Sequence, residues 1–305
     1  MIPNNLFNFL QCVDCGHSSF NKGDNSLQCQ HCDKSYPLKD GIPSMMKGGP
    51  EKQNWNPWDN DKIQMMGNSY YKRAKGELPE KESSKSYAKL IKEKELFSPE
   101  TNFLDIGCAT GHFLRSFRNI VDPKIHYTGV DVTEHYLHWG KEVYGVDEYC
   151  SFVHCDALHM PFKDNSYDYV IVNLFHFFPK VDDALQEAMR VAKKMVIWRT
   201  PIGQVNYMIK FLLNEQSFER LGVLTPDREN FDHSVYMLYT KDYIKGLTKH
   251  LGGSVSFIEQ DLDFEDFDNT SLEEFKGHPS TKTIAGMQIN GNLYLDWHYI
   301  GIQVN

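Results

Sequence analysis

The sequence lacks any long hydrophobic run. Its apolar stretches fall well short of the roughly eighteen residues that cross a bilayer, and the first residues, MIPNNLFNFLQC, do not place a basic region before a hydrophobic one. We therefore expect a soluble, unsecreted protein of the cytoplasm, with no membrane partner. A chain of 305 residues, 41% of them hydrophobic, can bury one large core and a small appendage, which predicts two domains.

Positive charge is also scarce. Lys and Arg number 32 against 41 Asp and Glu, which gives a formal net charge of −9. This balance works against a general grip on the phosphates of nucleic acids, although a local basic patch could overcome it. RNA is therefore a less favoured partner than a small molecule.

Cysteines are few and odd in number. Four of the seven form two C-x-x-C pairs in CVDCGHSSFNKGDNSLQCQHC, which fits metal binding in a reducing compartment better than disulfides. Four thiolates can surround zinc as a tetrahedron and leave no position for water, so the metal would fold the module without taking part in chemistry. His17 and His31 could replace a cysteine, but exposed loop histidines are the favoured interpretation. The predicted zinc ligands are Cys12, Cys15, Cys29 and Cys32.

These cysteines predict a zinc ribbon over residues 1–47. Between residues 12 and 47 four lysines are balanced by four aspartates and there is no arginine, a neutrality that argues against an RNA clamp. The polar segment 48–84 then indicates a linker with a short helix. It also contains four aromatic residues, Trp55, Trp58, Tyr70 and Tyr71.

Glycines punctuate FLDIGCATGHF, residues 103–113, where a strand-forming run meets a turn and a helix. Such a turn lets the backbone approach a nucleotide cofactor. Binding sites for nicotinamide and flavin cofactors typically have the pattern G-x-G-x-x-G, whereas this turn has the sequence Gly107-Cys-Ala-Thr-Gly111. Asp105 at the strand end would repel a pyrophosphate. It suits S-adenosylmethionine (SAM), which carries an α-ammonium group and a sulfonium centre and has no phosphate.

Three successive strands each end in an acid. A helix over SYAKLIKEKELF comes first, and NFLDIGC, IHYTGVDV and CSFVHC then alternate with helices, which predicts a parallel sheet. Asp105, Asp131 and Asp156 would meet at its carboxyl edge, where Asp131 can accept hydrogen bonds from ribose hydroxyls. Taken singly, Asp105 could cap the turn, Asp131 could start a helix and Asp156 could be a loop acid.

Residues from about 85 to 200 resemble class I SAM-dependent methyltransferases with a methyltransferase-11-like domain. Besides the glycine turn, VDDALQEAMRVAKKMVIWRTP is similar to the family's L-x-E-x-x-R-V-L-x-P-G-G stretch, with Ala192-Lys193-Lys194 in place of P-G-G. The resemblance implies a Rossmann-like α/β domain over 85–305 with a mostly parallel seven-stranded sheet, and an acid after the third strand that accepts the adenine amino proton. The implied cofactor-binding residues are Asp105, Gly107, Ala109, Gly111, Asp131, Val132, Asp156, Ala157 and Asn173.

The N-terminal region carries a second resemblance. Residues 10–46 are similar to the zinc ribbons at the front of many bacterial methyltransferases and in free-standing methyltransferase partner subunits, so a protein partner of the ribbon is one expectation. In similar enzymes an aromatic N-terminal segment folds over the cofactor cleft. Packing of the ribbon onto the main domain is an equal alternative for the four aromatic residues of 48–84.

The acceptor side is less well marked. His176 follows the fourth strand and is the candidate catalytic base, because its ordinary pKa suits proton acceptance; alternatively it fixes the start of the next helix. Asn173-Leu174-Phe175-His176 stands where the amino-methyltransferases of the family carry Asn/Asp-Pro-Pro-Tyr, which disfavours methylation of exocyclic amines on DNA.

A helical insertion over about 203–250 is expected to cover the cleft. Its aromatic residues could line a pocket, although packing in the core is favoured for each one: Tyr207, Phe211, Phe231, Tyr236 and Tyr239. The acidic run 259–274, EQDLDFEDFDNTSLEE, could supply ligands to a divalent cation, but a solvated charged face is favoured.

These patterns predict a SAM-dependent methyltransferase that acts on a small molecule or glycan, at oxygen or nitrogen. The zinc ribbon suggests one alternative, an RNA base methyltransferase. Another is a SAM-binding partner module that does not catalyse.

Overall fold

The computed structural model describes residues 6–48, 61–145, 147–178, 181–212, 233–261, 282–284, 287–290 and 293–305. Trp55, Trp58, Phe231, the side chain of Phe211 and most of the acidic run, 262–274, lie outside the described residues. Among the helices of these ranges, none combines the length and the apolar character that crossing a bilayer needs.

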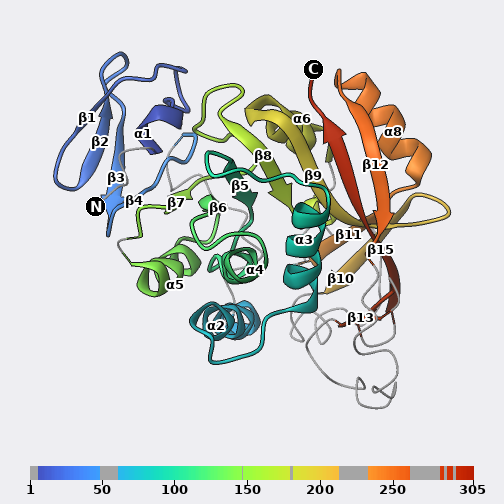
Figure 1. Cartoon of the computed structure of the whole chain (residues 1–305). Coiled ribbons are helices and arrows are strands. Elements are labelled where there is room, and N and C mark those ends of the chain that lie inside the picture. The colour runs from blue at the N-terminus through green and yellow to red at the C-terminus, as the bar shows by residue number, and fades with distance from the viewer. Residues whose placement is uncertain are drawn as a thin grey trace, which may run out of the picture.

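The N-terminal module is a small antiparallel sheet in the order β1-β2-β3-β4 (Figure 1). Its elements are α1 (Leu6–Phe9), β1 (Phe20–Lys22), β2 (Ser26–Cys29), β3 (Ser35–Lys39) and β4 (Ile42–Pro43). Along β3 exposed and buried residues alternate, because successive side chains of a strand point to opposite faces. Strands this short bury little apolar surface by themselves, so the module depends on further contacts for its stability.

Seven strands of the nine-stranded main sheet follow one another in the order β7-β6-β5-β8-β9-β15-β12. They are β5 (Asn102–Ile106), β6 (His126–Asp131), β7 (Cys150–His154), β8 (Tyr167–Val172), β9 (Ala192–Ile202), β12 (Ser254–Gln260) and β15 (Leu293–Gln303). Strands β5 to β9 pair in parallel, and β15 is antiparallel to β9 and β12. Two short strands, β13 (Lys282–Ile284) and β14 (Met287–Asn290), continue the sheet from β15. The predicted Rossmann-like, mostly parallel seven-stranded sheet is confirmed.

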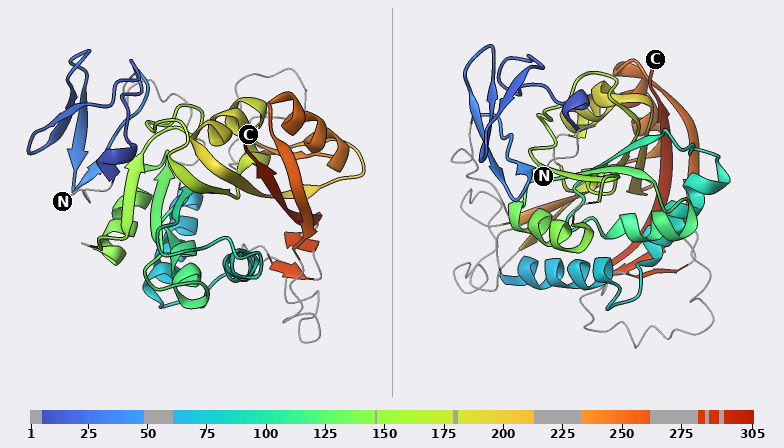
Figure 2. Two further views of the ribbon diagram at one scale, coloured as in Figure 1. Left: turned by 45° about the horizontal axis from the view of Figure 1, so that its top comes forward. Right: turned by 60° about the vertical axis from the view of Figure 1, so that its left-hand side comes forward.

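Helices cover both faces of this sheet (Figures 1 and 2). Phe103 of β5 packs in a cluster with α3, α4 and α5, whereas its neighbour Leu104 packs in a second cluster with α6 and α8, as the alternation of a strand requires. The ribbon lies at the β7 edge and α8 at the opposite edge (Figure 2). The helices are α2 (Asp61–Lys75), α3 (Glu82–Glu93), α4 (His112–Ile120), α5 (Glu134–Tyr144), α6 (Val181–Val191) and α8 (Lys241–His250), with a 3₁₀ turn, η2 (Phe175–Phe177).

The ribbon and the main sheet share one hydrophobic core. Leu10 forms a β-bridge with Phe162, and Ser44 forms another with His154 at the end of β7. Buried side chains from both units belong to the same hydrophobic cluster: Leu6, Leu10, Leu27, Tyr36 and Met45 from the ribbon, and Val153, Met160 and Phe162 from the main domain. The ribbon is therefore fixed along the edge of the main sheet.

The insertion is only partly helical. Strands β10 (Tyr207–Leu212) and β11 (His233–Leu238) form an antiparallel pair, whereas α8 is a helix. The prediction of a helical insertion over 203–250 is thus wrong for these two segments. Their sequences, YMIKFL and HSVYML, mix aromatic, apolar and polar residues, and their backbone groups are satisfied by pairing with each other. Over six residues, apolar periodicity alone does not separate a strand from a helix.

Candidate active site

A left-handed turn follows β5 and opens helix α4. The angle φ is positive at Gly107 (71°), Ala109 (50°) and Gly111 (68°). Glycine adopts this region freely, whereas at Ala109 it costs about 1–2 kcal/mol. A Cβ atom at Gly107 would also lie 2.0 Å from Cδ2 of Leu174, in the segment after β8. The turn therefore uses glycine both for backbone conformation and for close approach.

Asp131 ends β6 and holds this turn in place. Its Oδ2 accepts a hydrogen bond from the Ala109 N–H at 2.8 Å, and its Oδ1 accepts one from the Thr133 N–H at 2.8 Å. Burial raises the pKa of the Asp131 carboxyl above its ordinary value, although the N–H groups oppose that shift. Each carboxylate oxygen accepts more than one hydrogen bond, so both retain capacity for further donors.

Asp105 lies in β5, the strand next to the one that ends in Asp131, and is buried. Its Oδ2 accepts a hydrogen bond from the Tyr127 hydroxyl at 2.5 Å. Burial raises the pKa of Asp105 to about 7, so at neutral pH the carboxyl is divided between its two protonation states. A cation beside it would favour the charged form.

Asp156 and Asn173 extend the same edge. Asp156 lies two residues beyond β7, its Oδ1 accepts from the Leu158 N–H at 3.0 Å, and its side chain is partly exposed. Asn173 directly follows β8. Because β7, β6, β5 and β8 are neighbours, their carboxyl ends form one continuous edge, where ligands bind in open α/β sheets. The structure places all the predicted cofactor residues on this edge: Asp105, Gly107, Ala109, Gly111, Asp131, Val132, Asp156, Ala157 and Asn173.

A buried ion pair beside Asn173 was missed by the sequence reasoning. Arg199 of β9 is buried, and its Nη2 lies 2.6 Å from Oδ2 of Asp261, which also accepts a hydrogen bond from Nε at 2.7 Å. Arg199 Nη1 donates to Asn173 Oδ1 at 3.1 Å, and the guanidinium lies 4.0 Å from the centroid of the Trp297 ring. The only available signal was one charge inside the apolar run MVIWRTP, because Asp261 is 62 residues away.

Comparison with known proteins identifies the unit that carries this edge. Residues 104–197 match the family described as the methyltransferase domain. These residues are a methyltransferase domain. Demethylmenaquinone methyltransferase of Staphylococcus aureus is 38% identical over 94 residues, which are 30% of this chain and 39% of that protein. The chain thus spans about two fifths of the length of the curated relatives it matches.

Solved structures resemble more of the chain. One matched chain comes from the complex between the Haloferax volcanii Trm112 methyltransferase activator and the putative methyltransferase. The alignment covers 78% of this chain and 94% of the matched chain, with a TM-score of 0.50 and 15% identity. Magnesium protoporphyrin IX methyltransferase of Synechocystis PCC 6803 matches 73% and 82%, with a TM-score of 0.44 and 13% identity. The first likeness shows that the fold of the methyltransferase domain is shared.

His176 lies in η2, directly beyond the carboxyl edge of the methyltransferase domain. It is 2% exposed, with ring centroids 4.1 Å from Phe177, 4.5 Å from Tyr236 and 5.0 Å from Trp297. Burial and then the charge of Arg199 lower the pKa of His176 well below its ordinary value, so the imidazole is neutral at physiological pH. Its Nδ1 has no hydrogen-bond partner in the described part of the chain.

The aromatic residues of the insertion differ in their surroundings. Tyr236 and Tyr239 are buried, whereas Tyr207 is 49% exposed. Tyr236 packs with Trp297 and Phe177 in a small apolar cluster beside His176. These rings form the wall of the methyltransferase domain next to Asn173 and Arg199.

Helix α2 covers the glycine turn of the methyltransferase domain. The Tyr70 ring stacks on His112, the first residue of α4, at 4.5 Å, and Tyr71 contacts Trp139 of α5 at 5.5 Å. A Cβ atom on Gly67 would lie 2.1 Å from Cε1 of Tyr136, which shows how closely α2 approaches α5. Tyr70 therefore packs beside the turn at the start of α4, and Tyr71 packs on α5; none of these contacts involves the ribbon.

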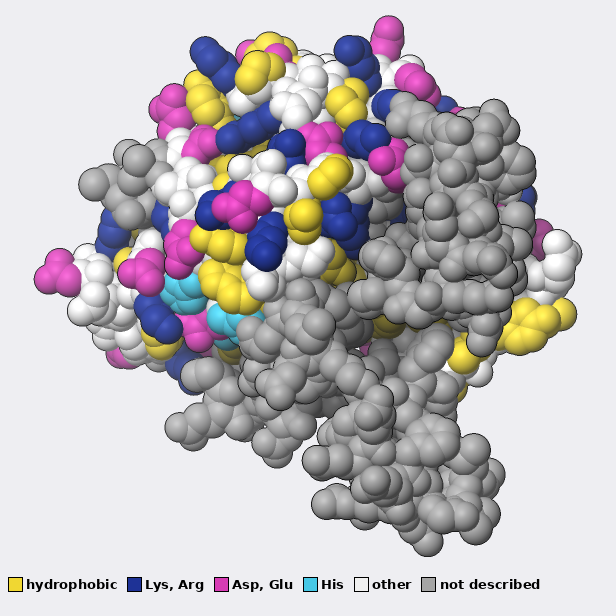
Figure 3. Space-filling model, turned by 90° about the horizontal axis from the view of Figure 1, so that it is seen from below, with side chains coloured by type: hydrophobic (Ala, Val, Ile, Leu, Met, Phe, Trp, Pro, Cys, Tyr) yellow, Lys and Arg dark blue, Asp and Glu magenta, His cyan; other side chains and the backbone are white. Residues whose placement is uncertain are grey.

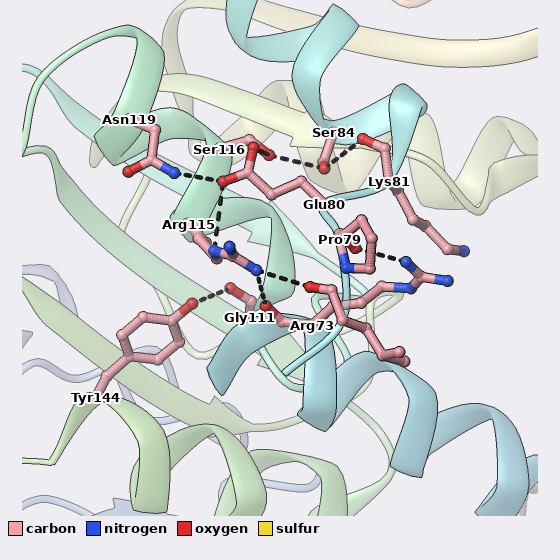
Figure 4. A network of polar contacts seen from close by, with 11 residues as sticks. Arg73, Pro79, Glu80, Lys81, Ser84, Gly111, Arg115, Ser116, Asn119 and Tyr144 are labelled. Atoms are coloured by element: carbon pink, nitrogen blue, oxygen red, sulfur yellow. Dashed lines mark hydrogen bonds and ion pairs between the residues drawn. The ribbon is translucent and has the colours of Figure 1, made fainter. Parts of the chain in front are cut away.

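The chain between α2 and α3 is anchored to α4 (Figure 4). Arg115 Nη1 donates to the carbonyl oxygens of Arg73 and Leu78, each at 2.9 Å, and its Nε lies 3.4 Å from a carboxylate oxygen of Glu80. The Ser116 hydroxyl donates to Glu80 at 3.1 Å. These contacts fix the end of α2 and so hold the cover over the turn.

The predicted zinc ligands converge in the ribbon, with all four Sγ atoms within 4.8 Å of one another. The distances Cys12–Cys32 and Cys15–Cys29 are both 3.6 Å. Zinc bound tetrahedrally at about 2.3 Å from each sulfur would separate the sulfurs by about 3.8 Å, so the cluster fits a structural zinc ion. The Tyr36 hydroxyl lies 2.9 Å from Cys12 Sγ and helps to orient this sulfur.

Proposed function

We propose that this protein is a methyltransferase that transfers a methyl group from SAM to oxygen or nitrogen of a small molecule or glycan. The observation that carries the proposal is the glycine turn locked to Asp131 at the carboxyl edge of the methyltransferase domain. A phosphate-bearing cofactor fits this edge poorly, because its negative charge would lie beside Asp105 at the end of β5. SAM fits these carboxylate acceptors, since it has cationic groups, ribose hydroxyls and no phosphate.

The residues divide into roles along the edge. Asp131 would accept the ribose hydroxyls through the free capacity of its oxygens, and the turn from Gly107 to Gly111 would lie against the amino-acid end of the cofactor beside Asp105. Asp156 would accept a hydrogen bond from the adenine amino group. Bound there, SAM supplies an electrophilic methyl group.

The acceptor would lie on the other side of Asn173. Arg199 fixes the Asn173 side chain through a hydrogen bond to its Oδ1, and Asp261 compensates the arginine charge. His176, packed against the rings of Tyr236 and Trp297, is the candidate base for an O–H or N–H acceptor. Its lowered pKa keeps the imidazole neutral but makes it a weaker base than the ordinary histidine that the sequence predicted. Holding the acceptor close to the methyl group is the main contribution that such a site makes to the rate.

Several observations support a small acceptor over RNA. The chain has a net charge of −9, and on the face seen in Figure 3 basic and acidic side chains are interspersed. Binding of RNA needs several phosphate contacts from Lys or Arg, which a mixed surface supplies poorly. The Staphylococcus relative is also named for a small molecule, demethylmenaquinone, although the similarity spans only 94 residues, 30% of this chain.

The test is turnover of methyl-labelled SAM by the purified full-length chain with two pools from the same cells, deproteinised small molecules and glycans in one and total RNA in the other. Asp131→Ala serves as the control that should lose activity. We expect label in the first pool and none in RNA. Label in ribosomal or transfer RNA, or micromolar RNA binding that falls steeply with salt, would favour an RNA methyltransferase. SAM binding without turnover on either pool would favour a non-catalytic partner module.

A further inference from the structure

The last residues of the ribbon reach the cofactor edge of the main domain. Ser44 follows β4 and pairs with His154, the final residue of β7, and the Met45 N–H donates to the His154 carbonyl at 2.8 Å. Ser44 and His154 are both buried. The ribbon thus continues the main sheet at the strand that neighbours β6, which ends in Asp131.

The His154 side chain connects two parts of the chain. Its Nδ1 lies 2.7 Å from the Ser44 hydroxyl oxygen, and its Nε2 lies 3.0 Å from the carbonyl oxygen of Val132. A carbonyl only accepts, so Nε2 must carry the hydrogen. Burial lowers the pKa of His154, which leaves the ring neutral, and Nδ1 therefore accepts from the Ser44 hydroxyl. The ribbon serine fixes the tautomer in which His154 can donate to Val132.

The peptide unit that His154 holds is the one that orients Asp131. The carbonyl of Val132 and the N–H of Thr133 belong to the same planar amide, which rotates as one body. Its oxygen accepts from His154, and its N–H donates to Asp131 Oδ1 at 2.8 Å. The other oxygen of Asp131 accepts from Ala109 of the glycine turn. Hydrogen bonds therefore run without a break from the ribbon to the glycine turn.

Other contacts between the ribbon and α5 are weaker. Lys39 Nζ lies 3.8 Å from Glu134, and His138 Nδ1 lies 3.3 Å from Asp40, but the side chains of Lys39 and Asp40 are 66% and 71% exposed. Solvent screens ion pairs of this kind, and each contributes little. By contrast, Ser44 and His154 are buried, so the path through His154 is shielded from solvent.

We propose that His154 is a positioning residue through which the zinc ribbon orients the carboxylate of Asp131, so that the ribbon sets the affinity of the site for its cofactor. The inference rests on the proposed function, because it assigns Asp131 to cofactor binding. It gives the ribbon a role inside the methyltransferase reaction of its own chain.

The test compares Ser44→Thr with Ser44→Val in the full-length protein. The two side chains have nearly the same shape, but only threonine keeps the hydroxyl that fixes the His154 tautomer. We expect Ser44→Val to weaken calorimetric binding of S-adenosylhomocysteine about fivefold to twentyfold, and Ser44→Thr to stay within about twofold of the wild type. Ser35→Val, at an exposed position of β3 in the same ribbon, is the matched control and should leave affinity unchanged.

Two further measurements separate positioning from general stability. Nitrogen-15 NMR of the imidazole should show the Nε2–H tautomer in the wild type and Ser44→Thr, and a mixture in Ser44→Val. In an Asp131→Ala background, Ser44→Val should cause no further loss of affinity, because the carboxylate it orients is gone. A folded Ser44→Val protein with an altered tautomer and unchanged affinity would overturn the inference, and so would additive losses. A wild type that binds neither SAM nor S-adenosylhomocysteine would instead overturn the proposed function.

Discussion

Single carboxylates at the sheet edge differ in what surrounds them, and Asp131 is the one tied to the glycine turn. Replacing Asp131 by alanine removes a charged acceptor for two ribose hydroxyls, worth about 1.5–3 kcal/mol, so SAM affinity should fall about tenfold to a hundredfold. Calorimetric titration with SAM measures the change, with Asp183→Ala on the exposed side of α6 as the control. Unchanged affinity in a folded Asp131→Ala protein would show that the assignment is wrong.

Asp105 predicts a pH dependence of stability. Its pKa in the folded protein is about 7, against an ordinary value of 3.8, so between these pH values the folded state binds more protons than the unfolded state. The contribution of the Asp105 carboxyl to the free energy of unfolding is therefore lost as the pH rises through this window. Asp105→Asn keeps an oxygen for Tyr127 but cannot ionise. Urea denaturation of the cofactor-free protein should show a stabilisation by Asp105→Asn that is greater at pH 8 than at pH 5 by about 2–3 kcal/mol.

The same variant tests the ligand of Asp105. If this carboxylate meets the cationic end of SAM, Asp105→Asn should weaken SAM binding while it stabilises the protein. A variant that gains stability and binds SAM as well as the wild type would leave Asp105 with a purely structural role.

His176 is the candidate base, and its surroundings make the prediction specific. General-base catalysis contributes about a hundredfold to ten-thousandfold, so His176→Phe should lower kcat by at least about a hundredfold and leave SAM affinity within a few-fold. Because burial lowers the pKa of His176 well below its ordinary value, kcat of the wild type should not change through titration of this residue between pH 7 and 9. Loss of thermal stability with kcat preserved would assign His176 to packing of the aromatic cluster.

Among the secondary-structure elements, α2 depends on one small residue. Alanine at Gly67 would place a methyl group 2.1 Å from the ring of Tyr136 and push α2 away from α5. We expect Gly67→Ala to destabilise the protein by about 1–3 kcal/mol and to weaken SAM binding, because α2 covers the glycine turn. Gly246→Ala is the matched control on α8, where no atom lies within 4 Å of the added Cβ, and it should stabilise by about 0.5–1 kcal/mol. Urea denaturation of both variants measures the contrast.

The strands of the main sheet could be predicted from sequence because their signals are local. The alternation of apolar strands with amphipathic helices located β5 to β9, and the acid and glycine pattern located the carboxyl edge. The pair β10 and β11 was missed because a segment of six residues is too short for its apolar pattern to separate a strand from a helix. The ion pair between Arg199 and Asp261 was missed because its partners are separated by 62 residues and meet only through the order of the strands.

For the molecule as a whole, the shared core predicts that loss of zinc lowers the stability of the entire protein. Cys29→Ser should lose the metal and unfold the ribbon, since the folding energy of such a module comes largely from its ligands. Because ribbon side chains pack into the core of the main domain, the melting temperature of the entire protein should fall, and SAM binding should weaken but remain measurable. Metal analysis, calorimetry and a thermal scan test this. A metal-free wild type with a folded ribbon would contradict the zinc assignment.

The joining of the ribbon to the main domain could not be predicted from either segment alone. The cysteine spacing located the ribbon. Its docking, however, depends on the bridges of Leu10 with Phe162 and of Ser44 with His154, and no local sequence pattern predicts either contact. Shape and burial decide such contacts, and they exist only once both units have folded.

The bridge between Leu10 and Phe162 also has a consequence in time. Phe162 follows Leu10 by 152 residues, and at about 5–20 residues per second a ribosome needs roughly ten to thirty seconds to supply it. Throughout that interval the ribbon can take up its metal, yet the apolar side chains of Leu6, Leu10 and Met45 have no partner to cover them. A ribbon that takes up its metal during this interval would therefore present a hydrophobic face to the chaperones that attend its synthesis.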